Sequence, residues 1–281
     1  MALKAMRVLV VMALVAALMQ LSQALGIAQF RRIAAQNNVT FMLVFGDSSV
    51  DPGNNNRLAT TTKGNFLPYG KNFFNGRPTG RFTDGRLATD FIAESFGFTN
   101  AIPAFLDPTI KKIDLLHGVS FASAGSGYDD LTANLSAMKS LGATRLVVVG
   151  VPPLGCMPIV KTLQDQTACV ESYNKVAASL NSKIREKLAI LRRTIGIKAA
   201  YIDCYDIILD AVNKPKKYGF TETAKGCCGT GTVEFGDTCR GLTTCTDAGK
   251  YIFWDAVHPT QKMYQIIARQ GLESLDVNAL F

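Results

Sequence analysis

The feature that most constrains the fold is a continuous apolar run, residues 39–45, that stops at Gly46. Runs without polar alternation are typical of strands buried on both faces of a parallel sheet, and a glycine directly after the run indicates a sharp turn. Further strands are predicted at residues 119–122, 145–149 and 197–202. Strands of this kind need covering layers on both faces of the sheet.

Helices are predicted between these strands. Residues 169–195 form the strongest candidate, because apolar residues recur with helical spacing and Gly196 can stop the helix. Its apolar stripe consists of Val176, Leu180, Ile184, Leu188 and Leu191. Shorter helices are predicted from a cap at Asp84 to about Phe96, ended by Gly97, and from a cap at Thr260 to about Arg269. Alternating strands and helices indicate an α/β fold with a doubly wound, mostly parallel sheet.

The first stretch, residues 1–24, is predicted to be a secretory signal peptide and not part of the fold. Basic Lys4 and Arg7 precede an apolar run over residues 8–19, and small residues follow up to Ala24. The alternative is a membrane anchor, but the run is shorter than the ~20 residues that span a bilayer. We therefore expect a secreted protein without an integral membrane segment.

The rest of the chain, residues 25–281, is long enough for one α/β domain. The formal net charge is +8, and loss of Lys4 and Arg7 with the signal leaves +6. Basic residues occur in scattered pairs without interleaved aromatic residues, which argues against a nucleic-acid partner. A solvated surface is the simpler interpretation, and an anionic cell wall or membrane face is the alternative.

The seven cysteines all follow residue 155. Disulfides are the expected state in a secreted chain, and the spacing lacks the CxxC pairs of a zinc site. We predict a Cys156–Cys169 bridge, with further bridges among four cysteines in the predicted loop at 213–250. Because the number is odd, at least one thiol stays free or pairs outside the chain, and Cys204 after an apolar strand is the candidate for a buried free thiol. Sequons at Asn38 and Asn134 fit the same compartment.

Only two histidines are present, His117 and His258. Asp255 precedes His258 by three residues, a spacing from which a carboxylate can orient the imidazole and stabilise its protonated form. Pro259 favours an extended backbone at His258. By itself this pattern also fits a structural histidine.

Ser48 lies just past the end of the first predicted strand, at the sheet edge where α/β proteins bind ligands. A serine in a Gly-Asp turn is also a common turn or helix-cap residue. The pairing with Asp255 and His258 favours nucleophilic chemistry, because a strand-end serine can meet them at one sheet edge. The G-x-S-x-G motif of ordinary α/β-hydrolases is absent from the sequence.

Six motifs in this order resemble the plant GDSL esterases/lipases of the SGNH hydrolase superfamily. They are VFGDSSVDPGNNN, PYGKNFFNGRPTGRFTDGRLATDFIAE, GVSFASAGSGYD, GVPPLGCMP, GCCGTG and YIFWDAVHPTQKMY. The resemblance implies a flavodoxin-like three-layer α/β/α fold with a mostly parallel sheet. It implies a monomeric, cofactor- and metal-free enzyme of the cell wall or apoplast that cleaves small-molecule or lipid esters.

The same resemblance implies the site residues. Ser48 would be the nucleophile, His258 the general base and Asp255 its orienting acid. The backbone N–H groups of Ser48 and Gly125, with Gly127 as the alternative, would bind the oxyanion.

One family block, G-x-N-D, has no counterpart, and its asparagine would supply a third oxyanion donor. We therefore predict an internal deletion near residues 129–145 that removes a central strand. Either the strand at 145–149 moves into the vacant slot, which puts Pro152 at the asparagine position, or the slot stays empty. The activity expected is that of a weakened esterase, and the alternatives are an inactive isoform or a non-catalytic binding protein.

Overall fold

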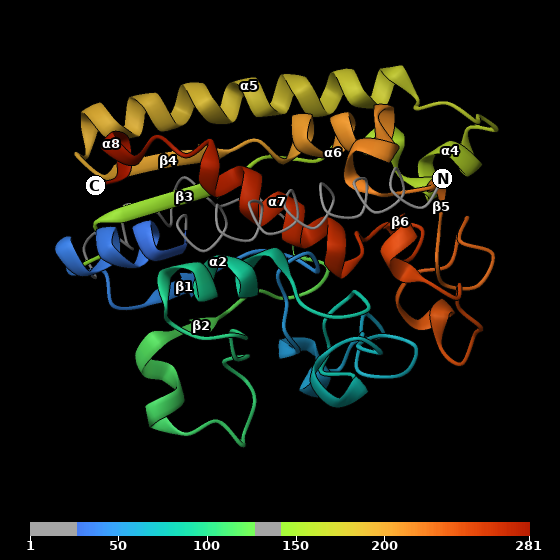
Figure 1. The fold of residues 1–281 in the computed structure, drawn as a ribbon, viewed down its shortest axis with the longest axis horizontal. Coiled ribbons are helices and arrows are strands. Elements are labelled where there is room, and N and C mark those ends of the chain that lie inside the picture. The colour runs from blue at the N-terminus through green and yellow to red at the C-terminus, as the bar shows by residue number, and fades with distance from the viewer. Residues whose placement is uncertain (1–26, 127–141) are drawn as a thin grey trace, which may run out of the picture.

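The computed structural model describes residues 27–126 and 142–281 (Figure 1). The predicted signal peptide, the sequon at Asn134, Gly127 and most of the predicted deletion junction lie outside these residues. The other sequon residue, Asn38, is exposed.

The described residues alternate between strands and helices, as predicted. The strands are β1 (Met42–Val44), β2 (Gly118–Ser120), β3 (Arg145–Val149), β4 (Lys198–Ile202), β5 (Glu222–Gly226) and β6 (Tyr251–Phe253). The helices are α2 (Ala88–Phe96), α4 (Pro158–Leu163), α5 (Glu171–Thr194), α6 (Cys204–Asn213), α7 (Gln261–Glu273) and α8 (Val277–Leu280). The elements β5, β6, α4, α6 and α8 were missed. The sequence of β5 is polar, β6, α4 and α8 have six residues or fewer, and α6 follows the apolar strand β4 without an intervening glycine or proline.

All strand pairs in the described residues are parallel, which confirms the α/β class. They form three two-stranded sheets, β1–β2, β3–β4 and β5–β6, and not one continuous sheet. Figure 1 shows β4, β3, β1 and β2 following one another across the molecule, with α5 along the outer side of β4. No described residue pairs β3 with β1, so the strand at 145–149 does not take the vacant place in a sheet with β1.

The prediction that residues 39–45 are buried on both faces is wrong. Val44 is buried against Ala93 and Ile102. Phe41, Leu43 and Phe45 point to the opposite face and are 53%, 48% and 51% exposed. Side chains alternate along a strand, so only the face that meets α2 gains cover, and no other described element covers the second face.

Helix α2 begins at Ala88 and not at Asp84, which corrects the predicted cap. The Asp84 carboxylate accepts from Gln261 N–H at 2.7 Å, so it stabilises the first turn of α7 instead. The end of α2 at left-handed Gly97 and the Thr260 cap of α7 are confirmed. Asp84 therefore links the loop before α2 to the helix that follows His258.

The predicted long helix is confirmed as α5, but only part of its apolar stripe is buried. Leu188 is buried against β3 and β4, with Ile184 and Leu191 beside it, whereas Val176 is 65% exposed. In the first half of α5 the buried positions are Asn174, Ala177 and Asn181. Hydrogen bonds explain this, because Asn181 binds both the N–H and the C=O of Val151 in the loop after β3.

Two apolar clusters fix the segment around β6. One lies between α6, α7 and β6, and the other joins Phe66, Tyr69, Phe82 and Trp254 to the cysteine-bearing loop. The predicted bridge Cys156–Cys169 is confirmed, and the other four cysteines form Cys227–Cys245 and Cys228–Cys239.

Cys204 is free and buried, as predicted. Burial and the nearby Asp203 raise the pKa of its thiol to about 12. In residues 27–126 and 142–281, no helix has both the length and the apolar character to cross a membrane.

Candidate active site

Ser48 is presented by the turn that follows β1. Asp47, not Ser48, makes the turn, because its carboxylate accepts from Ser49 N–H at 2.9 Å and Ser49 Oγ at 2.7 Å. A side chain at Gly46 would come within 2.7 Å of Val50, so the sharp turn needs glycine there. The Ser48 hydroxyl is thereby free to face another element, and it lies 2.9 Å from Nε2 of His258.

His258 and Asp255 are held by a tight loop between β6 and α7. Trp254 N–H donates to His258 C=O at 2.7 Å, which closes the loop. Oδ1 of Asp255 accepts from the N–H groups of Val257 and His258 at 2.8 and 2.6 Å. This leaves Oδ2 facing Nδ1 of His258 at 2.8 Å, so the three-residue spacing does place the carboxylate on the imidazole.

Burial fixes the roles of the two ring nitrogens. Asp255 is 0% and His258 5% exposed, and the imidazole packs against Phe82 with ring centroids 5.1 Å apart. A buried carboxylate next to Nδ1 favours the tautomer that carries its proton there. Nε2 can then accept the Ser48 proton.

His117 is not part of this arrangement. It is exposed at the end of the 3-10 segment Lys112–His117, and its imidazole forms no hydrogen bond with any described residue. The sequence-based preference for His258 thus agrees with the geometry.

Ser48 and Gly125, two of the predicted oxyanion donors, lie in loops. Within the described parts of the chain, neither Ser48 N–H nor Gly125 N–H donates a hydrogen bond. Gly125 has φ 87° and is exposed, so its N–H can face a ligand. The alternative donor, Gly127, is outside the described residues.

Three polar residues after the turn that presents Ser48 shape the loop that contains Gly125. Asp51 accepts from Ala124 N–H at 3.0 Å, and Asn54 donates to the C=O groups of Ser120 and Ala122 at 2.8 Å. Asn55 donates to Ala124 C=O at 2.8 Å. The side-chain amide groups of Asn54 and Asn55 are thus used on backbone carbonyls and not on a ligand. Asp51 was missed as a loop-positioning residue because nothing in its spacing points to residue 124.

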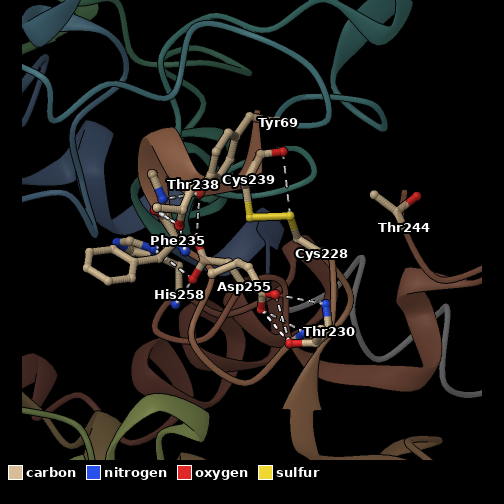
Figure 2. Close-up of a disulfide and its surroundings, with 12 residues drawn as sticks. Tyr69, Cys228, Thr230, Phe235, Thr238, Cys239, Thr244, Asp255 and His258 are labelled. Carbon is tan, nitrogen blue, oxygen red and sulfur yellow. Dashed lines mark hydrogen bonds and ion pairs between the residues drawn. A yellow bond between two sulfur atoms is a disulfide. The ribbon is translucent and has the colours of Figure 1, made fainter. Parts of the chain in front are cut away.

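Tyr69 was also missed. Its hydroxyl donates to Oδ2 of Asp255 at 2.7 Å across 186 residues of sequence (Figure 2). It lies in the Pro-Tyr-Gly sequence of one of the six motifs, but that motif by itself indicates no partner.

No group of three or more His, Cys, Asp or Glu side chains in the described part of the chain is arranged to hold a metal ion. The site consists instead of a half-buried serine at a strand end, a histidine and a buried carboxylate. This is the arrangement of a serine hydrolase.

The sequence model of the GDSL-like lipase/acylhydrolase family matches residues 42–141 and 128–270. The chain belongs to this family, whose members hydrolyse ester substrates. This membership confirms the resemblance seen in the sequence motifs.

Curated relatives from Arabidopsis thaliana match most of the chain. The GDSL esterase/lipase At5g45950 is 44% identical over 323 positions, which cover 87% of this chain and 90% of the relative. GDSL esterase/lipase EXL3 is 36% identical and covers 80% of this chain and 85% of its own. GDSL esterase/lipase At2g40250 is 35% identical, with 84% and 90% covered.

Each of these alignments has more positions than the number of residues of this chain that it covers. In the first, 87% of 281 residues is about 244 residues, so about 79 of the 323 positions face no residue of this chain. The family model likewise matches two separate regions of the chain, and these regions overlap at residues 128–141.

Proposed function

We propose that the chain is a secreted serine esterase in which Ser48 forms the acyl-enzyme. His258 takes the Ser48 proton through Nε2 as Oγ attacks the ester carbonyl, and Asp255 stabilises the imidazolium. His258 then returns the proton to the leaving alcohol, and water repeats the sequence to release the acid. The observation that carries this proposal is the continuous chain of contacts from Ser48 Oγ through His258 to Asp255.

The proposed oxyanion hole has two backbone donors, from Ser48 and Gly125. The nearby asparagines supply no third donor, because the amide groups of Asn54, Asn55 and Asn56 bind backbone carbonyls. Loss of one oxyanion donor lowers the rate by about 10²–10³. We therefore propose an active but weakened enzyme.

The weakened hole is ascribed to a missing internal segment near residues 129–145. Support comes from the unmatched positions in the alignment with At5g45950 and from the two-piece family match. The strand order β2, β1, then β3, β4 fits a flavodoxin-like, three-layer α/β/α fold from which the strand between β1 and β3 is absent. The exposed face of β1 fits the same interpretation.

A fluorophosphonate probe tests the proposed function, because it labels only an activated serine. We expect Ser48 to be labelled in the folded chain and labelling to disappear in Ser48→Ala. Ser95→Ala is the matched control, since the Ser95 hydroxyl donates to Phe91 C=O within α2. Labelling that persists in Ser48→Ala, or that never occurs in the folded wild type, would overturn the proposal.

A further inference from the structure

The Asp255 carboxylate has a partner that the Ser–His–Asp chemistry does not require. Oδ2 accepts from the Tyr69 hydroxyl at 2.7 Å and also faces Nδ1 of His258 at 2.8 Å. Figure 2 shows Tyr69, Asp255 and His258 close to one another, next to the Cys228–Cys239 bridge. Tyr69 therefore touches the oxygen that orients the imidazole.

The direction of this hydrogen bond is fixed by a third group. Gly236 N–H donates to the Tyr69 hydroxyl oxygen at 2.6 Å. A backbone N–H can only donate, so the single hydroxyl proton is left for Asp255. Burial and the Asp255 charge raise the pKa of Tyr69 well above its usual range, which keeps this proton in place.

The Tyr69 ring has little freedom to turn away. It is fully buried and meets Phe66, Phe82 and Trp254 edge-on, with centroids 5.6 to 6.4 Å apart. Gly236 belongs to the loop closed by the Cys228–Cys239 bridge, so the group that sets the proton direction is held as well. The hydroxyl is thus preorganised for Asp255.

We propose that Tyr69 is a positioning residue for the Asp255–His258 pair. Its O–H holds Oδ2 toward Nδ1 and takes up part of the carboxylate charge. This inference rests on the proposed function, because it assigns a role within the same site. Without this hydrogen bond, more of the Asp255 charge acts on the imidazole, so the ring keeps its proton to a higher pH. The carboxylate is also held less firmly, so the imidazole accepts the Ser48 proton in a poorer orientation.

The other ionisable groups near the pair allow a matched control. The charges of Asp47 and Asp255 both act on the buried Tyr264, and Lys71 Nζ lies 5.0 Å from the centre of the Trp254 ring. The Tyr264 hydroxyl is buried but has no hydrogen-bond partner among the described residues. Tyr264→Phe therefore removes a buried phenol oxygen near Asp255 without removing a hydrogen bond.

The test measures the rate of Ser48 labelling by a fluorophosphonate across the pH range in which imidazole titrates. We expect Tyr69→Phe to slow labelling about tenfold at its optimum and to move the acid limb to higher pH. Tyr264→Phe should match the wild type in both respects. Equal rates and equal acid limbs in Tyr69→Phe and wild type would overturn the inference.

A second variant keeps the test decisive if Tyr69→Phe does not fold. Incorporation of 3-fluorotyrosine at position 69 retains the hydroxyl and makes it a stronger donor, so the acid limb should move to lower pH. An unchanged acid limb in this variant would contradict the proposed role. If wild-type Ser48 is never labelled, the proposed function fails and this inference fails with it, whereas labelling that is indifferent to residue 69 overturns this inference alone.

Discussion

Nε2 of His258 lies 2.9 Å from Oγ of Ser48, although 210 residues separate them in the chain. The contact joins the turn after β1 to the loop between β6 and α7. The two-stranded sheet β1–β2 does not pair with β3–β4 in the described residues. The turn after β1 and the loop after β6 are nevertheless in contact through Ser48 and His258. The contact between Ser48 and His258 therefore depends on the loops and clusters around β6 more than on a continuous sheet.

Replacement of His258 by alanine is expected to abolish both Ser48 labelling and ester hydrolysis. The reason is that Nε2 is the one base that contacts the Ser48 hydroxyl among the described residues. His117→Ala is the control and should keep most of the activity, since His117 is exposed and its imidazole forms no hydrogen bond with a described residue. Hydrolysis of an activated ester by each purified variant checks both expectations, and loss in His117→Ala alone would reverse the assignment.

Insertion of the segment that At5g45950 carries between the two matched regions is expected to raise kcat. A third donor would stabilise the oxyanion only in the transition state, so a gain of about 10²–10³ in kcat with little change in KM is expected. Steady-state kinetics on one activated ester, with short and restored forms side by side, measure it. Equal turnover would show that another group already completes the oxyanion hole.

Protonation of Glu234 at low pH is expected to destabilise the loop that precedes Asp255. Burial opposes ionisation of Glu234, but hydrogen bonds from Thr230 and from backbone N–H groups outweigh it and lower the pKa to about 2. A depressed folded-state pKa means that the stabilisation is present above the ordinary pKa of 4.5 and is lost as pH falls toward 2.

Thermal unfolding as a function of pH tests this expectation. Glu234→Gln should lower Tm at neutral pH and flatten the acid dependence, whereas Glu273→Gln, at an exposed position at the end of α7, should leave the acid dependence as in wild type. A Glu234→Gln curve parallel to wild type would contradict the assignment.

Removal of Arg81 is expected to destabilise the fold strongly. Its guanidinium forms two hydrogen bonds of 2.9 Å with the Asp90 carboxylate, and both side chains are buried. Loss of one partner from a buried pair typically costs about 3–5 kcal/mol, because the other charge is left uncompensated. Denaturant unfolding of Arg81→Ala measures the loss, and Lys214→Ala, which breaks an exposed pair with Asp210, should change stability little. Similar midpoints for the two variants would refute the prediction.

Much of the local structure was predictable because it depends on short-range patterns. The strand Arg145–Val149, the long helix Glu171–Thr194 and the Thr260 cap follow from side-chain period and capping chemistry within a few residues. The Asp255–His258 contact was predictable for the same reason, since three residues separate the partners.

Other features could not be predicted because they join distant segments. Asp84 has the chemistry of a cap for its own helix, but the tertiary structure gives it to α7. Val176 continues the apolar stripe of α5, yet the structure buries Asn181 instead because the loop after β3 needs its amide. In both cases the competing partner is far away in sequence, so no local pattern carries it.

The sequence by itself determined the α/β class, the family and three residues able to form a Ser–His–Asp site, because motifs and spacing are written along the chain. Only the tertiary structure decided that Ser48 meets His258, that β3 stays apart from β1, and that Tyr69 and Asp51 support the site. The physical reason is that hydrogen bonds and burial act over a few ångströms in space, whatever the separation in sequence.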